Sequence, residues 1–167
     1  MKNIYIIGGT MGVGKTTVCQ ALKKELPNSV FLDGDWCWDA HPFQVTEETK
    51  EMVQENISYL LNNFIHCSAY ENVIFCWVMH DQNIIDHLMK GLDTKDCKIK
   101  VISLICSENA LRERLEKDVM KGIRTVDVIE RSIARLPLYQ ELNTKKIDTT
   151  NKSVETIVRE LASSLDA

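Results

Sequence analysis

A glycine-rich segment near the start of the chain constrains the fold more than any other feature. Residues 9–16 are GTMGVGKT and match the pattern G-x-x-x-x-G-K-[ST] at every fixed position. The segment follows the apolar run Ile4 to Ile7, typical of a buried strand, and precedes apolar residues at helical spacing. Between a strand and a helix, such a loop points backbone N–H groups and the positive end of the helix dipole at one anion. The sequence therefore predicts a nucleotide phosphate site.

Two side chains of this segment carry the expected chemistry. Lys15 supplies a mobile charge that can follow the β- and γ-phosphates, and the Thr16 hydroxyl is the expected Mg²⁺ ligand. We expect ATP rather than GTP, because the guanine-binding pattern Asn-Lys-x-Asp does not occur in the chain. The predicted nucleotide-binding residues here are Gly9, Thr10, Met11, Gly12, Val13, Gly14, Lys15, Thr16 and Thr17.

Length and charge limit the possible partners. The 167 residues, 44% of them hydrophobic, suit one domain spanning residues 1–167. A formal charge of −4, without a large basic cluster, argues against nucleic acid and favours a small-molecule partner. The start of the chain lacks a basic and apolar leader, and no apolar run has membrane-spanning length. We therefore expect a cytoplasmic protein, a monomer or homodimer, whose six cysteines are reduced thiols.

Strand-like and helix-like segments alternate along the chain. Apolar runs predict strands at residues 4–7, 29–32, 73–79, 98–106 and 146–149. Helical spacing predicts helices at about residues 16–26, 46–69, 82–91, 108–121 and 126–139, and from 154 onward. Thr46, Asp81, Ser107 and Ser153 are placed to cap four of them. This order predicts an α/β fold, a five-stranded parallel sheet with helices on both faces.

Two aspartates follow the second predicted strand. The carboxyl ends of parallel strands form the ligand side of such a sheet, so Asp33 and Asp35 are expected beside the phosphate loop. We expect Asp33 to support Mg²⁺ and contact the substrate, and Asp35 to accept the proton of an attacking hydroxyl. A plainer alternative is that Asp33-Gly34 is a turn and one aspartate caps it. The third predicted strand ends without an aspartate, so metal support is expected from the second strand.

Aromatic residues are concentrated after the aspartates and at the end of the third predicted strand. Such side chains suit an acceptor that is planar or amphipathic. Trp77 could equally be a core residue, and His80 could be a surface histidine rather than a substrate contact. The predicted acceptor-pocket residues are Trp36, Trp38, Phe43, Trp77 and His80.

The motifs together resemble those of the small P-loop kinases, a group that includes nucleoside monophosphate, shikimate, gluconate and adenylylsulfate kinases and chloramphenicol phosphotransferase. Residues 32–35, Leu-Asp-Gly-Asp, resemble the strand-end aspartates of adenylylsulfate and gluconate kinases. The spacing of Arg124, Asp127, Arg135 and Tyr139 is similar to the lid region of nucleoside monophosphate kinases. The resemblance covers essentially the whole chain and implies a P-loop NTPase fold with an arginine-bearing lid at about residues 118–135.

The resemblance also implies roles for the arginines. Arg114 matches the arginine that stacks on the donor base, whereas Asp118 stands where many of these enzymes carry a phosphate-binding arginine. Arg124 and Arg131 are expected to close over the triphosphate, and Arg135 to bridge the transferring phosphoryl group. The alternative for each arginine is a solvated helix face with partners four residues away.

The first functional hypothesis is an ATP- and Mg²⁺-dependent phosphotransferase. Its acceptor would be a hydroxyl of a small uncharged metabolite, nucleoside or antibiotic. Lys15, Asp35, Arg124 and Arg135 are its predicted catalytic residues. One alternative is a nucleoside monophosphate kinase, weakened because no arginine or lysine occurs between Asp35 and Lys50 to hold an acceptor phosphate. Another is a nucleotide-binding switch without small-molecule kinase activity.

Overall fold

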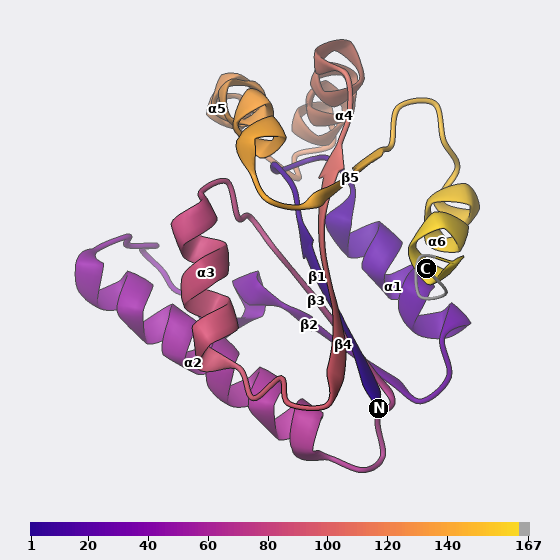
Figure 1. The fold of residues 1–167 in the computed structure, drawn as a ribbon. Coiled ribbons are helices and arrows are strands. Elements are labelled where there is room, and N and C mark those ends of the chain that lie inside the picture. The colour runs from indigo at the N-terminus through magenta and orange to yellow at the C-terminus, as the bar shows by residue number, and fades with distance from the viewer. Residues whose placement is uncertain (164–167) are drawn as a thin grey trace.

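The chain folds around one parallel sheet with helices on both faces (Figure 1). The structure is a computed structural model and describes residues 1–163. The strands lie in the order β2-β3-β1-β4-β5, and every neighbouring pair is parallel. They are β1 (Lys2–Gly8), β2 (Ser29–Asp33), β3 (Asn72–Trp77), β4 (Cys97–Ile105) and β5 (Lys145–Asp148). The predicted fold class is confirmed.

Strand alternation divides the core into two layers. Tyr5 and Ile7 of β1 face one cluster, whereas Ile4 and Ile6 face the other, and all four are fully buried. The first cluster is covered by α1 (Lys15–Glu25), α4 (Glu108–Met120), α5 (Asp127–Arg135) and α6 (Val154–Ser163). The second is covered by α2 (Glu47–His66) and α3 (Gln82–Gly91). Figure 1 shows α4 and α5 beyond the end of the sheet opposite to the N-terminus.

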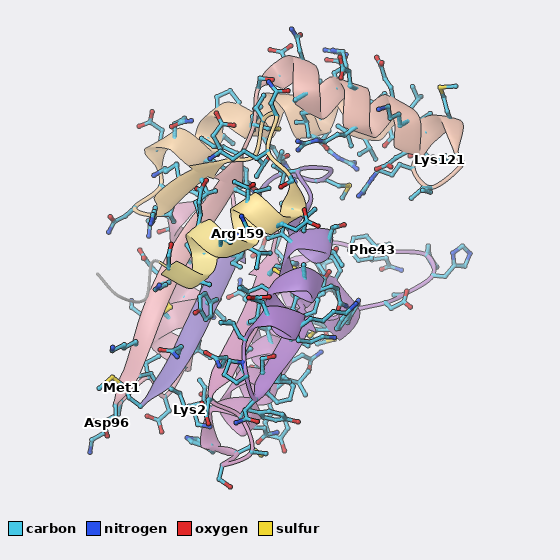
Figure 2. All side chains as sticks on the ribbon, turned by 90° about the vertical axis from the view of Figure 1, so that its right-hand side faces the viewer. Met1, Lys2, Phe43, Asp96, Lys121 and Arg159 are labelled. Carbon is cyan, nitrogen blue, oxygen red and sulfur yellow. The ribbon has the colours of Figure 1, made fainter. Side chains whose placement is uncertain are left out.

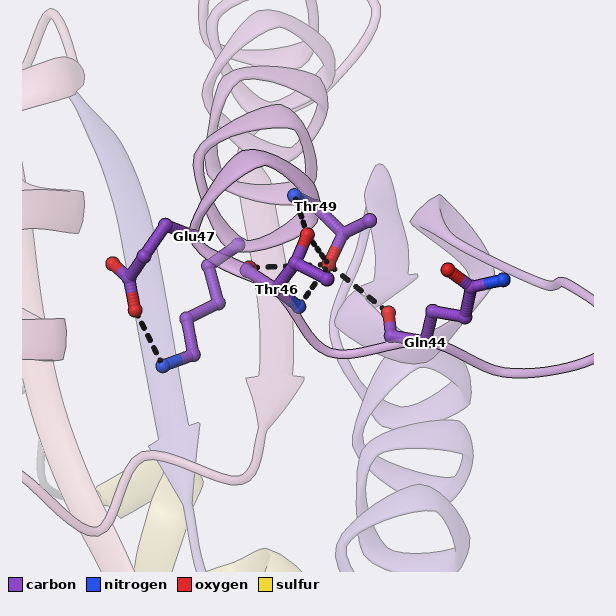
Figure 3. Close-up of polar contacts among 5 residues, drawn as sticks. Gln44, Thr46, Glu47 and Thr49 are labelled. Atoms are coloured by element: carbon purple, nitrogen blue, oxygen red, sulfur yellow. Dashed lines mark hydrogen bonds and ion pairs between the residues drawn. The ribbon is translucent and has the colours of Figure 1, made fainter.

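The predicted helix caps are present. The hydroxyls of Thr46 and Ser107 accept hydrogen bonds from backbone N–H groups in the first turns of α2 and α4, and the Asp81 carboxylate does so for α3. At α2 the cap is reciprocal, because the Thr49 hydroxyl also accepts from the Thr46 backbone N–H at 2.8 Å (Figure 3). This cap sets the residue at which the irregular segment after β2 ends and α2 begins.

Two boundaries differ from the predictions for clear reasons. The third strand was expected to reach Met79, but β3 ends at Trp77, which is opposite Gly8, the last residue of β1. The helix expected to reach Tyr139 ends at Arg135, where a 3-10 helix (Leu136–Glu141) with Pro137 in its first turn takes over. Within residues 1–163, no helix is long and apolar enough to cross a membrane.

Candidate active site

The glycine-rich segment forms a tight loop between β1 and α1. Gly12 and Gly14 adopt φ angles of 89° and 106°, which L side chains rarely adopt. A Cβ on Gly12 would lie 2.5 Å from Cδ2 of Leu115, so α4 packs directly on the loop. Gly14 is the N-cap of α1, and the helix begins at Lys15. The N-terminal end of α1 therefore points into the loop, as an anion site requires.

Lys15 lies over the loop to which it belongs. Its Nζ donates to the carbonyl oxygens of Gly9 at 2.7 Å and Thr10 at 3.1 Å. Desolvation by burial lowers the pKa of Lys15, and the nearby Cys76 thiol and the Asp35 and Asp33 carboxylates oppose this shift. A desolvated ammonium group attracts phosphate oxygens more strongly than an exposed one.

Thr16 and Asp33 lie side by side at the start of α1 and the end of β2. The Thr16 hydroxyl donates to Oδ2 of Asp33 at 3.0 Å, and Oδ1 of Asp33 accepts from the Asp35 backbone N–H at 2.9 Å. Asp33 thus caps its own turn, as the plainer alternative predicts, and also reaches the phosphate loop, while its role toward Mg²⁺ and the substrate stays a prediction. A hydroxyl beside a buried carboxylate is a donor set that suits Mg²⁺. Among residues 1–163 there is no cluster of three or more His, Cys, Asp or Glu side chains able to hold a metal. A Mg²⁺ ion at Thr16 and Asp33 would therefore take its other ligands from phosphates and water.

Asp35 is the second residue of the 3-10 helix Gly34–Cys37 and faces the same space as Lys15. Its pKa is raised, first by desolvation against the surrounding protein and then by the Asp33 carboxylate. Lys15, a hydrogen bond from the Trp77 side chain, and Arg124 act in the opposite direction. A raised pKa makes a carboxylate a better proton acceptor, provided that it remains ionised at the working pH.

These groups line one cleft of about 320 Å³ at the carboxyl end of the sheet. It runs from the phosphate loop to Asp35 and is bounded above by residues of α4 and of the turn that follows α4. Its lining residues are Met11, Gly12, Gly14, Lys15, Thr16, Thr17, Asp33, Asp35, Val78, Arg114, Asp118 and Arg124. The donor-side candidates and Asp35, the predicted proton acceptor, therefore share one cavity.

Arg114 forms one wall of this cleft. Its Nη1 donates to the Val13 carbonyl at 3.1 Å and to the Thr149 hydroxyl at 3.2 Å, and its Nη2 donates to the Thr149 carbonyl at 3.2 Å. The guanidinium group thus ties the phosphate loop to the residue that follows β5. Its contact to the donor base stays a prediction.

Asp118 pairs with Arg124, a contact that was not predicted from the sequence. Nε of Arg124 donates to Oδ2 of Asp118 at 2.9 Å, and each side chain is 29% exposed. The Asp118 carbonyl also accepts from the N–H groups of Ile123 and Arg124, closing the turn in which Gly122 has φ 72°. The pair lies six residues apart across a helix end, so no helical spacing rule could have indicated it.

The other two predicted arginines lie outside the cleft lining. Arg131 is 52% exposed and forms an i,i+4 ion pair with Asp127 at 3.7 Å. Arg135 is half-buried beside His80 and Tyr139. Burial and the Arg135 charge lower the pKa of His80, and its Nδ1 is buried without a hydrogen-bond partner in the described chain. His80 is therefore not an ordinary surface histidine.

The aromatic candidates are not among the residues that line the cleft. Phe43, Trp38 and Trp77 form a row of edge-to-face ring contacts, called here the aromatic ladder. Trp38 contacts Phe43 edge-to-face at 4.8 Å between ring centroids and Trp77 at 6.2 Å. Trp36 packs on Phe31 instead, at 5.2 Å, and remains 55% exposed. Figure 2 shows Phe43 on the same side of the molecule as Lys121 at the end of α4, away from Met1 and Asp96. The ladder thus lies at the cleft end of the molecule.

One further contact joins the loop to the predicted lid. The Thr10 hydroxyl is fully buried and donates to the Ser132 carbonyl of α5 at 2.8 Å. Thr10 was predicted only as part of the loop. The two residues are 122 positions apart in the sequence. No local sequence pattern could therefore predict the contact.

The sequence of the chain is similar to those of known proteins. The family described as an AAA domain matches residues 6–133. Shikimate kinase from Bacillus anthracis strain CDC 684 / NRRL 3495 is 32% identical over 171 residues, with 96% of each chain covered.

Solved structures of low sequence identity share the fold. The gluconokinase from Sinorhizobium meliloti 1021 has a TM-score of 0.70 and 19% identity, covering 98% of this chain and 91% of its own. Shikimate kinase from Acinetobacter baumannii, in complex with shikimate, has a TM-score of 0.64 and 20% identity, covering 99% of this chain and 93% of its own.

Proposed function

Because the chain belongs to the family of P-loop kinases that includes the shikimate kinases, we propose that it phosphorylates a hydroxyl of a small uncharged acceptor. It is a small-molecule kinase that uses ATP and Mg²⁺. The observation that carries the acceptor side of the proposal is the position of Asp35, which lines the same cleft as Lys15 and Thr16. A carboxylate placed there can accept a hydroxyl proton while the loop holds the donor phosphates.

On the donor side, the loop N–H groups and Lys15 hold the phosphates, and Thr16 with Asp33 would hold Mg²⁺. The metal supplies charge neutralisation of the phosphate oxygens when bound. Lys15 must exchange the carbonyl oxygens of Gly9 and Thr10 for phosphate oxygens, which are stronger acceptors for an ammonium group. Arg114 faces the donor base end of the cleft.

On the acceptor side, Asp35 orients the hydroxyl and takes its proton as the hydroxyl oxygen bonds to the γ-phosphorus of ATP, while the bond from that phosphorus to the bridging oxygen breaks and ADP leaves. The segment between Asp35 and Lys50 contains no lysine or arginine, which favours an uncharged acceptor. The aromatic ladder offers ring faces and edges to an amphipathic molecule. His80, with an unpartnered buried ring nitrogen, is proposed as a further acceptor contact.

Residues 118–135 are proposed to act as a lid, within one kinase domain spanning residues 1–167. Arg124 already lines the cleft, whereas Arg131 and Arg135 must approach from α5 to reach the phosphates. Closing the lid would keep water away from the phosphoryl group and so suppress ATP hydrolysis. We further propose that the enzyme acts in the cytoplasm as a monomer or homodimer and does not use nucleic acid.

A screen for acceptor-dependent ADP release tests this proposal. The full chain is incubated with ATP and MgCl₂ and with polyols, sugars, nucleosides, shikimate or AMP, one at a time. We expect an uncharged hydroxyl compound to raise ADP release above the basal rate. Shikimate as the sole active compound would contradict the uncharged acceptor, and AMP as the sole active compound would indicate a nucleoside monophosphate kinase. A flat result across the panel would favour the nucleotide-binding switch.

A further inference from the structure

Trp77 occupies the end of β3, beside the turn that carries both aspartates. In the parallel register of β2 and β3, Asp33 is opposite Cys76. Gly34, the first residue after β2, therefore lies beside Trp77, the last residue of β3. The sequence alone left Trp77 as either a core residue or a pocket wall.

The indole ring of Trp77 rests on the backbone of Gly34. A Cβ built on Gly34 would lie 2.5 Å from Cγ and 2.6 Å from Cδ1 of Trp77, distances that real Cβ atoms essentially never show. Gly34 has no unusual φ angle, so glycine is needed here for close approach and not for backbone freedom. The ring thus fixes the residue that separates Asp33 from Asp35.

The same side chain also reaches Asp35. The indole Nε1–H is a donor only, and hydrogen bonding from Trp77 is one of the influences that oppose the rise in the pKa of Asp35. Trp38 also packs edge-to-face against the indole of Trp77, with ring planes at 72°. Trp77 therefore contacts both Gly34 and Trp38, and these two contacts limit the orientations that its indole can adopt.

We propose that Trp77 is a positioning residue for Asp35: its ring is seated on Gly34, and its indole N–H orients the carboxylate toward the acceptor hydroxyl. A carboxylate on an exposed turn would otherwise sample several rotamers. A small displacement of a proton acceptor can reduce the rate about a hundredfold. This role rests on the proposed function of Asp35, but the contact itself does not.

Nuclear magnetic resonance tests the contact without any acceptor. The chain contains three tryptophans, so ¹⁵N-tryptophan labelling gives three indole N–H signals. The signal lost in Trp77→Phe belongs to Trp77. We expect Asp35→Ala to shift this signal and speed its exchange with solvent, whereas Asp39→Ala, at an exposed carboxylate in the same segment, leaves it in place. An unmoved Trp77 signal in Asp35→Ala would overturn the proposal.

Kinetics then test the consequence, with an acceptor identified by the ADP-release screen. Trp77→Phe keeps most of the ring and removes the donor, so we expect kcat to fall about tenfold to a hundredfold with KM for ATP unchanged. The same change at the neighbouring indole, Trp38→Phe, is expected to raise KM for the acceptor instead. If Trp77→Phe raises only the acceptor KM, Trp77 is a pocket wall and the positioning role is wrong. If no acceptor is found but the indole signal responds to Asp35→Ala, the proposed kinase reaction fails and the contact stands.

Discussion

At the scale of single residues, several positions serve two purposes at once. Asp33 stabilises its own turn through Oδ1 and reaches Thr16 through Oδ2. Gly12 supplies both a left-handed backbone and the space that Leu115 occupies. A sequence pattern indicates one purpose of such a residue, and only the fold reveals the second.

Gly12 and Gly14 of the phosphate loop allow a matched test of whether a glycine serves the backbone conformation alone or also provides packing space. Both have positive φ, but a Cβ on Gly14 would meet nothing within 4 Å, whereas one on Gly12 would meet Leu115. We expect Gly14→Ala to cost about 1–2 kcal/mol of unfolding free energy from backbone strain. Gly12→Ala should cost about 1–3 kcal/mol more, because α4 must move. Urea denaturation measures both, and equal losses would show that the α4 contact contributes nothing.

At the scale of elements, the lid arginines differ in their surroundings. Arg124 and Asp118 are each 29% exposed and line the cleft, while Arg131 and Asp127 form a looser pair that is more than half exposed. The pair uses Nε of Arg124, and a guanidinium group carries four further N–H donors on its two Nη atoms. Arg124 can therefore contact phosphate without leaving Asp118.

Substitution of Arg124 tests the lid. We expect Arg124→Ala to lower kcat about 10²–10³-fold, the typical loss for one donor that stabilises transition-state charge. The control is Glu130→Gln, which removes the charge from the 2.7 Å pair with Arg112 between α4 and α5, where the Glu130 side chain is 75% exposed. Exposed pairs contribute about 0–1 kcal/mol, so turnover should not change. Steady-state kinetics that show equal effects for the two variants would remove Arg124 from the mechanism.

Element positions were largely predictable, because they depend on local chemistry. The apolar runs located all five strands, and Thr46, Asp81 and Ser107 marked the starts of their helices. The end of β3 was not predictable, because it depends on where β1 stops as a partner. Contacts between distant segments, such as Thr10 with Ser132, require tertiary structure.

At the scale of the whole molecule, the sheet brings the site together. β1 lies between β3 and β4, so the loop after β1 opens beside residues that follow β3, and β2 is one strand further out. The alternation of strands and helices predicted a parallel sheet but not this order, which depends on which strands pair. The order explains why Lys15, Asp35 and Val78 line one cleft although they are far apart in sequence.

The central claim is that this one cleft binds the donor and also activates the acceptor. Asp35→Asn tests it most directly, with Asp39→Asn as the matched control on an exposed carboxylate of the same segment. Calorimetric titration with ATP and MgCl₂ should give the same affinity for both variants and the unsubstituted chain. Transfer to the acceptor from the ADP-release screen should fall about 10²–10⁴-fold in Asp35→Asn alone, as expected for loss of a general base. Unchanged transfer in Asp35→Asn would contradict the account.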